Sequence, residues 1–188
     1  MTHLISPALT NRQKNVLTGT ILGGSSLVKA AGSRNCYLSM RSKDLRWLEF
    51  KSSEISSLAS GTPFTKDTTN RWHSMCYPVF NQMREQFYDE NRRKLKMESM
   101  DLLSDVAYAI WFGDAGTYPN HHVVLNTHVW GEDGTNLIVQ YFSEVGYTSE
   151  VIRERGSYRV KLDRESSLAF FRLAEPHLPV WFLRERFV

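Results

Sequence analysis

Hydrophobic residues with helical spacing open the chain and indicate its first helix. After a helix cap at Thr10 or Asn11, one stripe of this predicted helix is formed by Val16, Leu17, Ile21 and Leu22. Gly19 and Gly23 lie four residues apart on the same helix. Because a glycine inside a helix costs about 1 kcal/mol relative to alanine, the two glycines predict that another backbone packs very close to this helix.

The remaining apolar positions predict a similar order of elements in both halves of the chain. In the first half they predict a hairpin of strands over 27–31 and 36–41, a helix over 42–59, a strand over 69–76 and a helix over 78–91. In the second half they predict a helix over 104–113, a strand over 123–130, a helix over 133–145, a hairpin over 148–162 and a helix over 166–177. This order predicts an α+β fold with antiparallel sheets, each with one face on helices and one open face.

Two short motifs indicate that the halves are copies of one design. They are LTGTILGGSSL (17–27) and YAIWFGDAGTY (108–118), and each runs from a helix into a turn and a strand. Their alignment places Gly24 opposite Ala115, an offset of 115 − 24 = 91, which is close to half of the 188 residues. We therefore expect two repeats, over 12–98 and 99–188, whose first helices pack together at a pseudo-twofold axis.

Composition and charge are those of an ordinary globular protein. Hydrophobic residues make up 41% and charged residues 23% of the chain, and the net charge of +3 permits nucleic-acid binding without requiring it. The two cysteines, Cys36 and Cys76, form neither a CxxC zinc motif nor a disulfide framework. The N-terminal sequence has no signal-peptide or transit-peptide pattern, and no long apolar run predicts a membrane span. We expect the protein to work where it is made, in a bacterial or phage-infected cytoplasm or in an organelle that encodes it.

Residues 12–186 resemble the single-chain, two-repeat LAGLIDADG homing endonucleases. The two motifs are similar to LxGxxLGDGxL and LAxWFMDDGxx of that family. The segment VVLNTH (123–128) resembles the family's LNTQSF strand, and residues 158–187 resemble its closing strand, helix, proline and basic residue. Two motifs at half-chain spacing, together with these two segments, make the resemblance specific.

The resemblance implies a fold, a partner and a reaction. The fold is a duplicated αββαββα unit, in which the two motif helices pack at the centre and two antiparallel sheets form a saddle for the major groove of double-stranded DNA. The protein would be a monomer that recognises a long asymmetric site and cuts both strands with Mg²⁺. Two carboxylates, one at the end of each motif helix, would hold the metal ions, because Mg²⁺ prefers hard oxygen ligands.

The sequence departs from this pattern at both catalytic acids. The family's acids fall at Gly24 and Ala115, so neither position has a carboxylate. Asp114, directly before Ala115, is the one acid at these positions that could bind a metal ion. We therefore expect this chain to bind at most one metal ion and to have lost cleavage. Lys94 and Arg184 match the basic residues that the family keeps beside its active site. Aspartate at both substituted positions would restore cutting if the surrounding pocket is preserved.

The open faces of the predicted strands nominate the nucleic-acid-binding residues. Polar side chains there can read base edges in the major groove, while arginine and lysine bind phosphates. The predicted set is Asn35, Tyr37, Ser39, Arg41, Asn126, His128, Arg153, Arg155, Arg159 and Lys161. A metal site built from His121, His122 and His128 is the weaker interpretation of those histidines, because no carboxylate or thiol completes it at a standard spacing.

Three functions remain compatible with the sequence. The first is a sequence-specific DNA-binding protein that cannot cut, through natural decay or deliberate inactivation. The second is an RNA-binding descendant, such as an intron maturase or a component bound to structured or ribosomal RNA. The third is a structural or protein-interaction domain, which would lack basic open faces on its sheets. The sequence does not separate duplex DNA from RNA as the partner.

Overall fold

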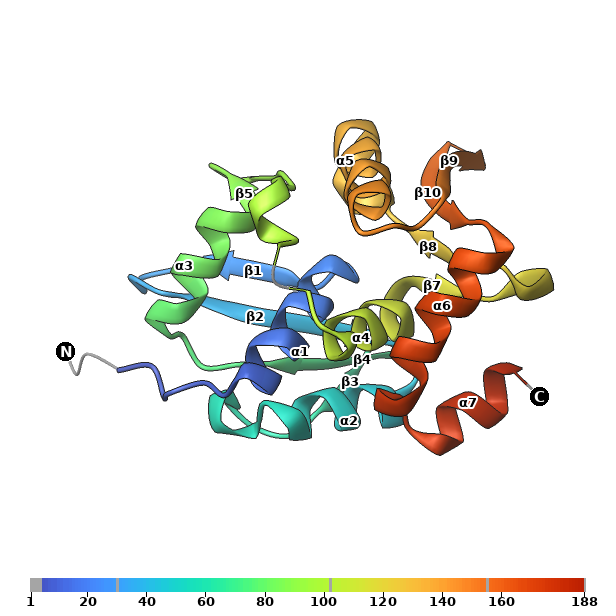
Figure 1. Cartoon of the computed structure of the whole chain (residues 1–188). Coiled ribbons are helices and arrows are strands. Elements are labelled where there is room, and N and C mark those ends of the chain that lie inside the picture. Colours follow the sequence, from blue (N-terminus) through green and yellow to red (C-terminus); the bar gives the residue numbers. More distant parts are fainter. Residues whose placement is uncertain (1–4, 30, 102, 155, 188) are drawn as a thin grey trace.

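The computed structural model describes the backbone of residues 5–29, 31–101, 103–154 and 156–187, and one order of elements occurs in it twice (Figure 1). The first half consists of α1 (Asn11–Leu22), β1 (Ser26–Lys29), β2 (Cys36–Ser42), α2 (Leu45–Glu54), β3 (Phe64–Lys66), β4 (Thr69–His73) and α3 (Pro78–Phe87), followed by the short pair β5 (Tyr88–Asp89) and β6 (Arg92–Arg93). The second half consists of α4 (Asp105–Ala115), β7 (Gly116–Thr117), β8 (Val124–Asn126), α5 (Gly131–Glu144), β9 (Ser149–Glu154), β10 (Ser157–Leu162) and α6 (Arg164–Ala174). The last helix is α7 (Val180–Phe187).

Each half builds one four-stranded antiparallel sheet. The strand order is β1-β2-β4-β3 in the first sheet and β7-β8-β10-β9 in the second. Ser26 pairs with Ser39 in the first sheet, and Thr117 pairs with Val124 in the second. Because the strands follow the same order in both sheets, the duplication extends from the motif helices into the sheets. The predicted α+β fold with two antiparallel sheets is confirmed.

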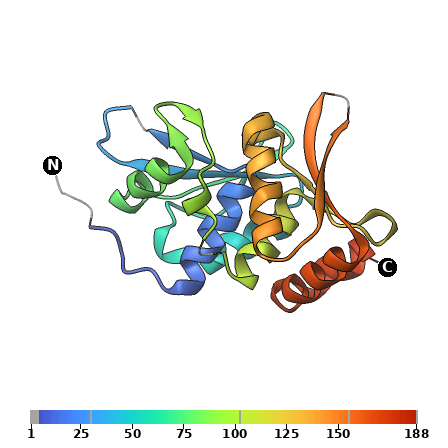
Figure 2. The ribbon, with the colours of Figure 1, turned by 45° about the horizontal axis from the view of Figure 1, so that its top comes forward.

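The motif helices α1 and α4 pack side by side at the centre of the molecule (Figures 1 and 2). Thr10 caps α1 in a capping box with Gln13, as the sequence predicts. A Cβ atom added to Gly19 would lie 2.5 Å from the carbonyl oxygen of Ala107 and 2.9 Å from the Cβ of Ile110. Glycine is therefore required where the two backbones meet, which confirms the close approach predicted from the spacing of Gly19 and Gly23.

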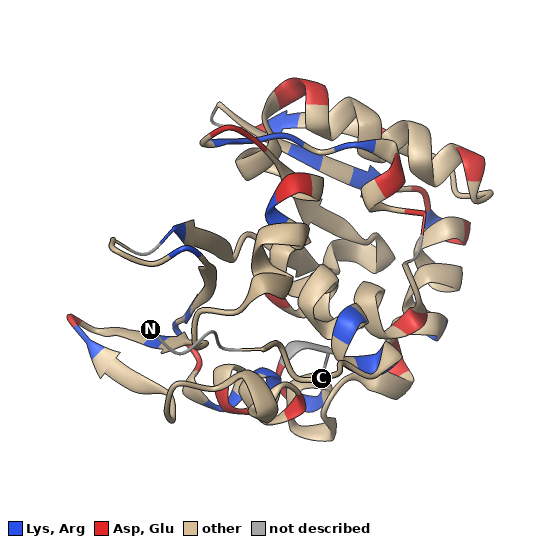
Figure 3. Cartoon of the chain, turned by 90° about the vertical axis from the view of Figure 1, so that its left-hand side faces the viewer, with Lys and Arg blue, Asp and Glu red and all other residues tan. Residues whose placement is uncertain are grey.

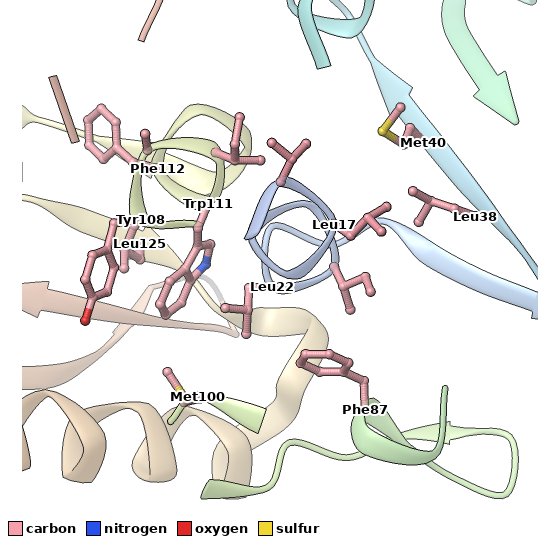
Figure 4. Packing of buried hydrophobic residues seen from close by; sticks show 14 of the residues in the cluster. Leu17, Leu22, Leu38, Met40, Phe87, Met100, Tyr108, Trp111, Phe112 and Leu125 are labelled. Atoms are coloured by element: carbon pink, nitrogen blue, oxygen red, sulfur yellow. The ribbon is translucent and has the colours of Figure 1, made fainter. Parts of the chain in front are cut away.

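A single hydrophobic core surrounds the two motif helices and continues under both sheets. In Figure 4, Leu22 from α1 lies near Trp111 from α4, while Leu17 on the other side of α1 points toward Leu38 of β2, and all four side chains are fully buried. The indole Nε1 of Trp130 donates to the carbonyl oxygen of Leu22, across the two halves, at 3.1 Å. In β2, Cys36, Leu38 and Met40 face this core, while the residues between them face outward, as their alternation predicts.

Several predicted boundaries differ from the observed ones. The helix predicted over 42–59 begins only at Leu45, because Asp44 caps it, and ends at Glu54 before a 3₁₀ turn at Ser56–Leu58. The strand predicted over 123–130 ends at Asn126, and a 3₁₀ turn follows at His128–Trp130. Four elements were missed, namely β3, β5, β6 and α7. All three residues of β3 are exposed, so its pattern carries no alternation. The helix predicted over 78–91 ends at Phe87, where β5 begins, and α7 follows Pro179 as a short terminal helix.

Candidate active site and nucleic-acid interface

The ends of the two motif helices lie beside two cavities that share Asp114. The cavity on the first side has a volume of about 360 Å³ and is lined by Gly24, Ser26, Ser39 and Arg41 together with Asp114. The cavity on the second side has a volume of about 230 Å³ and is lined by Asp114, Ala115, Asn126 and Arg159. The two positions that the resemblance assigns to catalytic acids therefore open toward the open faces of the two sheets, one on each side of Asp114.

Asp114 is bound by the protein itself. The ammonium of Lys51 lies 2.7 Å from each carboxylate oxygen, and the indole Nε1 of Trp47 donates to Oδ1 at 2.6 Å. The Lys51 side chain has no exposed surface and that of Asp114 is 9% exposed. Both partners come from α2 of the first half, whereas Asp114 is on α4 of the second half. The carboxylate thus already has a cation and a neutral donor before any metal could approach.

The end of the first motif helix has a different backbone from that of the second. The amide N–H of Ser25 donates to the carbonyl oxygen of Thr20, and that of Gly24 donates to Ile21, which is the Schellman arrangement that ends a helix. Gly24 has φ +108°, a conformation that L side chains rarely adopt. By contrast, α4 continues through Ala115. Gly24 is therefore a helix-terminating glycine in addition to lacking a carboxylate.

The Arg93 guanidinium completes this helix end. Its Nη2 donates to the carbonyl oxygens of Gly24 and Ser25, at 2.8 Å each, and to Oγ of Ser26 at 3.0 Å. The group also lies over the ring of Trp130, 5.4 Å from its centroid. Burial lowers the pKa of Arg93 from its ordinary value, but an arginine starts so high that it stays charged at neutral pH. A fixed positive charge therefore lies beside the position of the first family acid.

This arrangement does not fit a pair of divalent metal ions. Gly24 and Ala115 offer no ligand, and both oxygens of Asp114 are engaged by Lys51. Within the described residues, no three side chains of His, Cys, Asp or Glu come together as a metal site. This holds also for His121, His122 and His128. The ring of His122 bonds to the carbonyl oxygen of Leu162, and that of His128 bonds to Asn126.

The two predicted basic neighbours of the active site have other contacts. Lys94 is exposed and pairs with Asp89 at 3.1 Å, while the preceding residue, Arg93, is the one that bonds to the end of α1. Arg184 is exposed on α7. That helix packs against α2 through Phe182 and Trp47, whose ring centroids are 4.9 Å apart. No contact of either residue with Gly24 or Ala115 is seen, and a catalytic role for Lys94 and Arg184 stays a prediction.

The open face of the first sheet carries cations and rings. Arg41 on β2 is directly opposite Arg71 on β4, and Ser39 is opposite His73. Tyr37 lies on the same face, because it is two residues from Ser39 along the strand. Asn35 precedes the strand, and its side-chain oxygen accepts from Asn81 at 3.0 Å. Tyr37, Ser39 and Arg41 therefore lie where the sequence places them.

The open face of the second sheet has its cations paired with acids. Asn126 on β8 is opposite Arg159 on β10. Arg159 pairs with Glu154 at 2.6 Å, and Lys161 pairs with Glu150 at 3.4 Å. Such exposed pairs contribute little to stability and can exchange for other partners. Figure 3 shows lysine and arginine positions on helices and strands in several parts of the ribbon.

Two of the predicted binding residues do not belong to the described open faces. Arg153 pairs with Tyr158 across β9 and β10, one residue out of phase with Arg159, so it lies on the opposite face of the hairpin. There its guanidinium lies over the Tyr158 ring, and Tyr158 donates to Glu132 of α5. The open-face prediction is wrong for Arg153, because the register of the hairpin was not known. Arg155 lies outside the described residues.

Comparison with known proteins agrees with this architecture. Residues 14–170 match the model of the LAGLIDADG DNA endonuclease family. The chain belongs to this family. A search of curated protein sequences finds no match. No helix within the described part of this LAGLIDADG protein is both long and apolar enough to cross a bilayer.

Several solved structures share the LAGLIDADG fold. The homing endonuclease I-WcaI, bound to its DNA recognition sequence, is similar with a TM-score of 0.86 at 14% identity, over 97% of this chain and 88% of that one. I-DmoI in complex with DNA and manganese is similar with a TM-score of 0.58 at 12% identity, over 89% and 99%. The full-length DUF199/WhiA protein of Thermotoga maritima is similar with a TM-score of 0.59 at 14% identity, over 97% and 63%. At such identities, these likenesses show the fold.

The residues that the sequence did not reveal at this LAGLIDADG centre are Lys51, Trp47 and Arg93. Lys51 and Trp47 lie four apart in α2, and the lysine is on the buried face of that helix. A lysine in register with a buried tryptophan is a signal for a buried partner, because lysine is almost never buried without one. Arg93 is one of two adjacent arginines before Lys94, and nothing in the sequence distinguishes which of the three basic residues turns inward.

Proposed function

We propose that this LAGLIDADG protein binds a long, asymmetric duplex DNA site as a monomer and does not cut it. The observation that carries the proposal is the state of the two acid positions. One is a helix-ending glycine, and the acid beside the other is neutralised by the buried Lys51. Hydrolysis of a phosphodiester by this family's route needs metal ions to activate water and to stabilise the developing charge, and this centre offers no vacant set of ligands for them.

The open faces retain what is needed for binding. Arg41 and Arg159 line the cavities on the two sides of Asp114, so that each sheet presents an arginine close to the central axis. Cations at these places can bind the phosphates on both sides of the site, and Ser39 and Asn126 beside them can donate to or accept from base edges. The DNA recognition sequence bound by I-WcaI supports duplex DNA as the partner.

The contacts around the two substituted acid positions involve more than those two residues. The Schellman ending of α1, the Arg93 guanidinium that bonds to it and the Lys51 ammonium on Asp114 form one arrangement. Aspartate at residues 24 and 115 is therefore not expected to restore cutting. At residue 24 it would have to adopt φ +108° or unwind the end of α1, and the two cations would remain.

Binding and cleavage are tested separately. Random duplexes are first enriched on the protein, and affinity for the enriched site is measured over a range of salt concentrations. Arg159→Ala should weaken binding and lower the salt slope by about one if Arg159 contacts a phosphate. Arg153→Ala is the matched control on the opposite face of the same hairpin, and it should leave the slope unchanged. Salt-independent binding would contradict the proposal.

The enriched duplex is then incubated with Mg²⁺ or Mn²⁺. The unaltered chain and the variant Gly24→Asp/Ala115→Asp should both leave it intact, since neither has a pocket that can hold two metal ions. Double-strand cleavage by the unaltered chain that stops on addition of EDTA would overturn the proposal. Selection of structured RNA in place of duplex DNA, at the same salt concentration, would favour the RNA-binding alternative.

A further inference from the structure

Three rings lie in a diagonal row across the open face of the first sheet. Tyr37 is on β2, His73 on β4 and Phe64 on β3, so the row crosses three neighbouring strands. The ring centroid of His73 lies 5.5 Å from that of Tyr37, with the planes perpendicular, and 5.7 Å from that of Phe64. β2 and β4 are the two central strands of the sheet (Figure 1). Two of the three rings therefore lie on the central strands of this face, and Phe64 lies on its edge strand.

The row is accessible, and two polar atoms on its strand β4 lack a hydrogen-bond partner. Phe64 is 44% exposed, and Tyr37 and His73 are half-buried. Among the described residues, Nδ1 of His73 and Nε of Arg71 have no hydrogen-bond partner although both atoms are buried. Burial, followed by the charges of Arg41 and Arg71, lowers the pKa of His73. The imidazole is therefore neutral at pH 7, and a neutral ring can stack on a base.

The fold itself does not require these rings, because the second sheet lacks them. Phe64 pairs with Arg71 on β4, and the corresponding pair on the second sheet is Ile152 with Arg159 on β10. No ring occurs at the outward-facing positions of β8, β9 and β10 in the described residues, and both cations there are paired with glutamates. In the first sheet, Arg41 and Arg71 lie beside the rings, and the acid near Arg71, Asp67, is 3.9 Å away and mostly exposed.

We propose that the open face of the first sheet binds unpaired bases of a single-stranded nucleic acid by stacking. Bases of a duplex are stacked on one another and present only their edges, so a duplex uses the ring faces poorly. A four-stranded sheet with aromatic residues on its central strands is a surface on which two or three bases of a single strand stack. Arg41 and Arg71 would hold the backbone phosphates of the same strand.

This inference goes beyond duplex binding and shares a face with it, so the two ligands should compete. Anisotropy of fluorescein-labelled oligonucleotides of about 12 nucleotides, which is within the site sizes of known single-strand-binding proteins, measures the affinity. The probes are oligo-U, oligo-dT and a duplex of the enriched site, at one salt concentration. Equal affinity for the two single strands would assign recognition to bases and phosphates, and tighter binding of oligo-U would add contacts with the 2′-hydroxyl.

Variants that remove one ring at a time test the stacking. Phe64→Leu and Tyr37→Leu should each raise the single-strand Kd by about 5- to 100-fold, which is the range for loss of one base–aromatic contact. Tyr37→Phe keeps the ring and should keep the affinity. Ile152→Ala is the matched control at the corresponding place on the second sheet, and it should change the Kd for neither single strand by more than about twofold. Urea denaturation verifies that each variant is folded.

The outcomes separate this inference from the proposed function. Binding of the duplex without measurable binding of either single strand would overturn the inference alone. Single-strand binding that is insensitive to both Leu variants would also overturn it. Failure to bind any probe would reject the duplex proposal as well. The stacking inference is supported if single-strand binding is lost in the two Leu variants and retained in Tyr37→Phe and Ile152→Ala.

Discussion

Replacing Lys51 by Met should destabilise this protein strongly, because it leaves the Asp114 carboxylate at the centre of the molecule without its cation. Lys51 is fully buried, and its ammonium is 2.7 Å from both carboxylate oxygens. Removing one partner of a buried ion pair costs about 3–5 kcal/mol. Asp114 retains 9% exposure and adjoins two cavities that admit water, and Trp47 still donates to it. We therefore expect the lower end, about 3 kcal/mol.

The assay is urea denaturation followed by tryptophan fluorescence and circular dichroism, with the m-value as a check that unfolding stays two-state. Asp114→Asn in the Lys51→Met background keeps the shape and removes the charge, so the double variant should recover most of the loss. Lys94→Met, which breaks the exposed pair with Asp89, is the control and should cost less than about 1 kcal/mol. A cost below about 1 kcal/mol for Lys51→Met would refute the reasoning. It would also be refuted if the costs of Lys51→Met and Asp114→Asn, measured singly, simply added up in the double variant.

Two further predictions concern the helix ends. Arg93→Met removes the donor for the carbonyl oxygens of Gly24 and Ser25 and should cost about 2–4 kcal/mol of stability, with faster amide exchange at the end of α1. Arg93→Lys should be destabilised as well, because an ammonium lacks the planar fork of the guanidinium. Full stability of either variant would contradict this role of Arg93. Asp163 caps α6 by accepting from the amide of Ser166 at 2.8 Å, which lowers its pKa, so Asp163→Ala should cost about 1 kcal/mol at pH 7. Because the pKa of Asp163 is lower in the folded than in the unfolded protein, this contribution to stability is present above about pH 4 and is lost as the pH falls through the folded pKa. A difference in unfolding free energy between the unaltered protein and Asp163→Ala that stays constant down to about pH 2 would contradict it.

The sequence alone determined the repeated elements and the close contact of the motif helices. Gly19 and Gly23 predicted that contact, because glycine has no side chain to keep two helix backbones apart. The alternation in β2 assigned Tyr37, Ser39 and Arg41 to the open face, since strand residues point alternately to the two sides. The sequence also shows that Gly24 and Ala115 carry no carboxylate.

Only the tertiary structure showed which side chains surround the two substituted acid positions. Lys51 is 63 residues before Asp114 and Arg93 is 69 residues after Gly24, and no local pattern links residues so far apart. The hairpin register that moves Arg153 to the opposite face depends on pairing between strands, as does the row of Tyr37, His73 and Phe64. Local sequence sets which face of an element is apolar, but which elements meet, and in which register, is set by the packing of the whole chain, because that packing decides which charges and rings become neighbours.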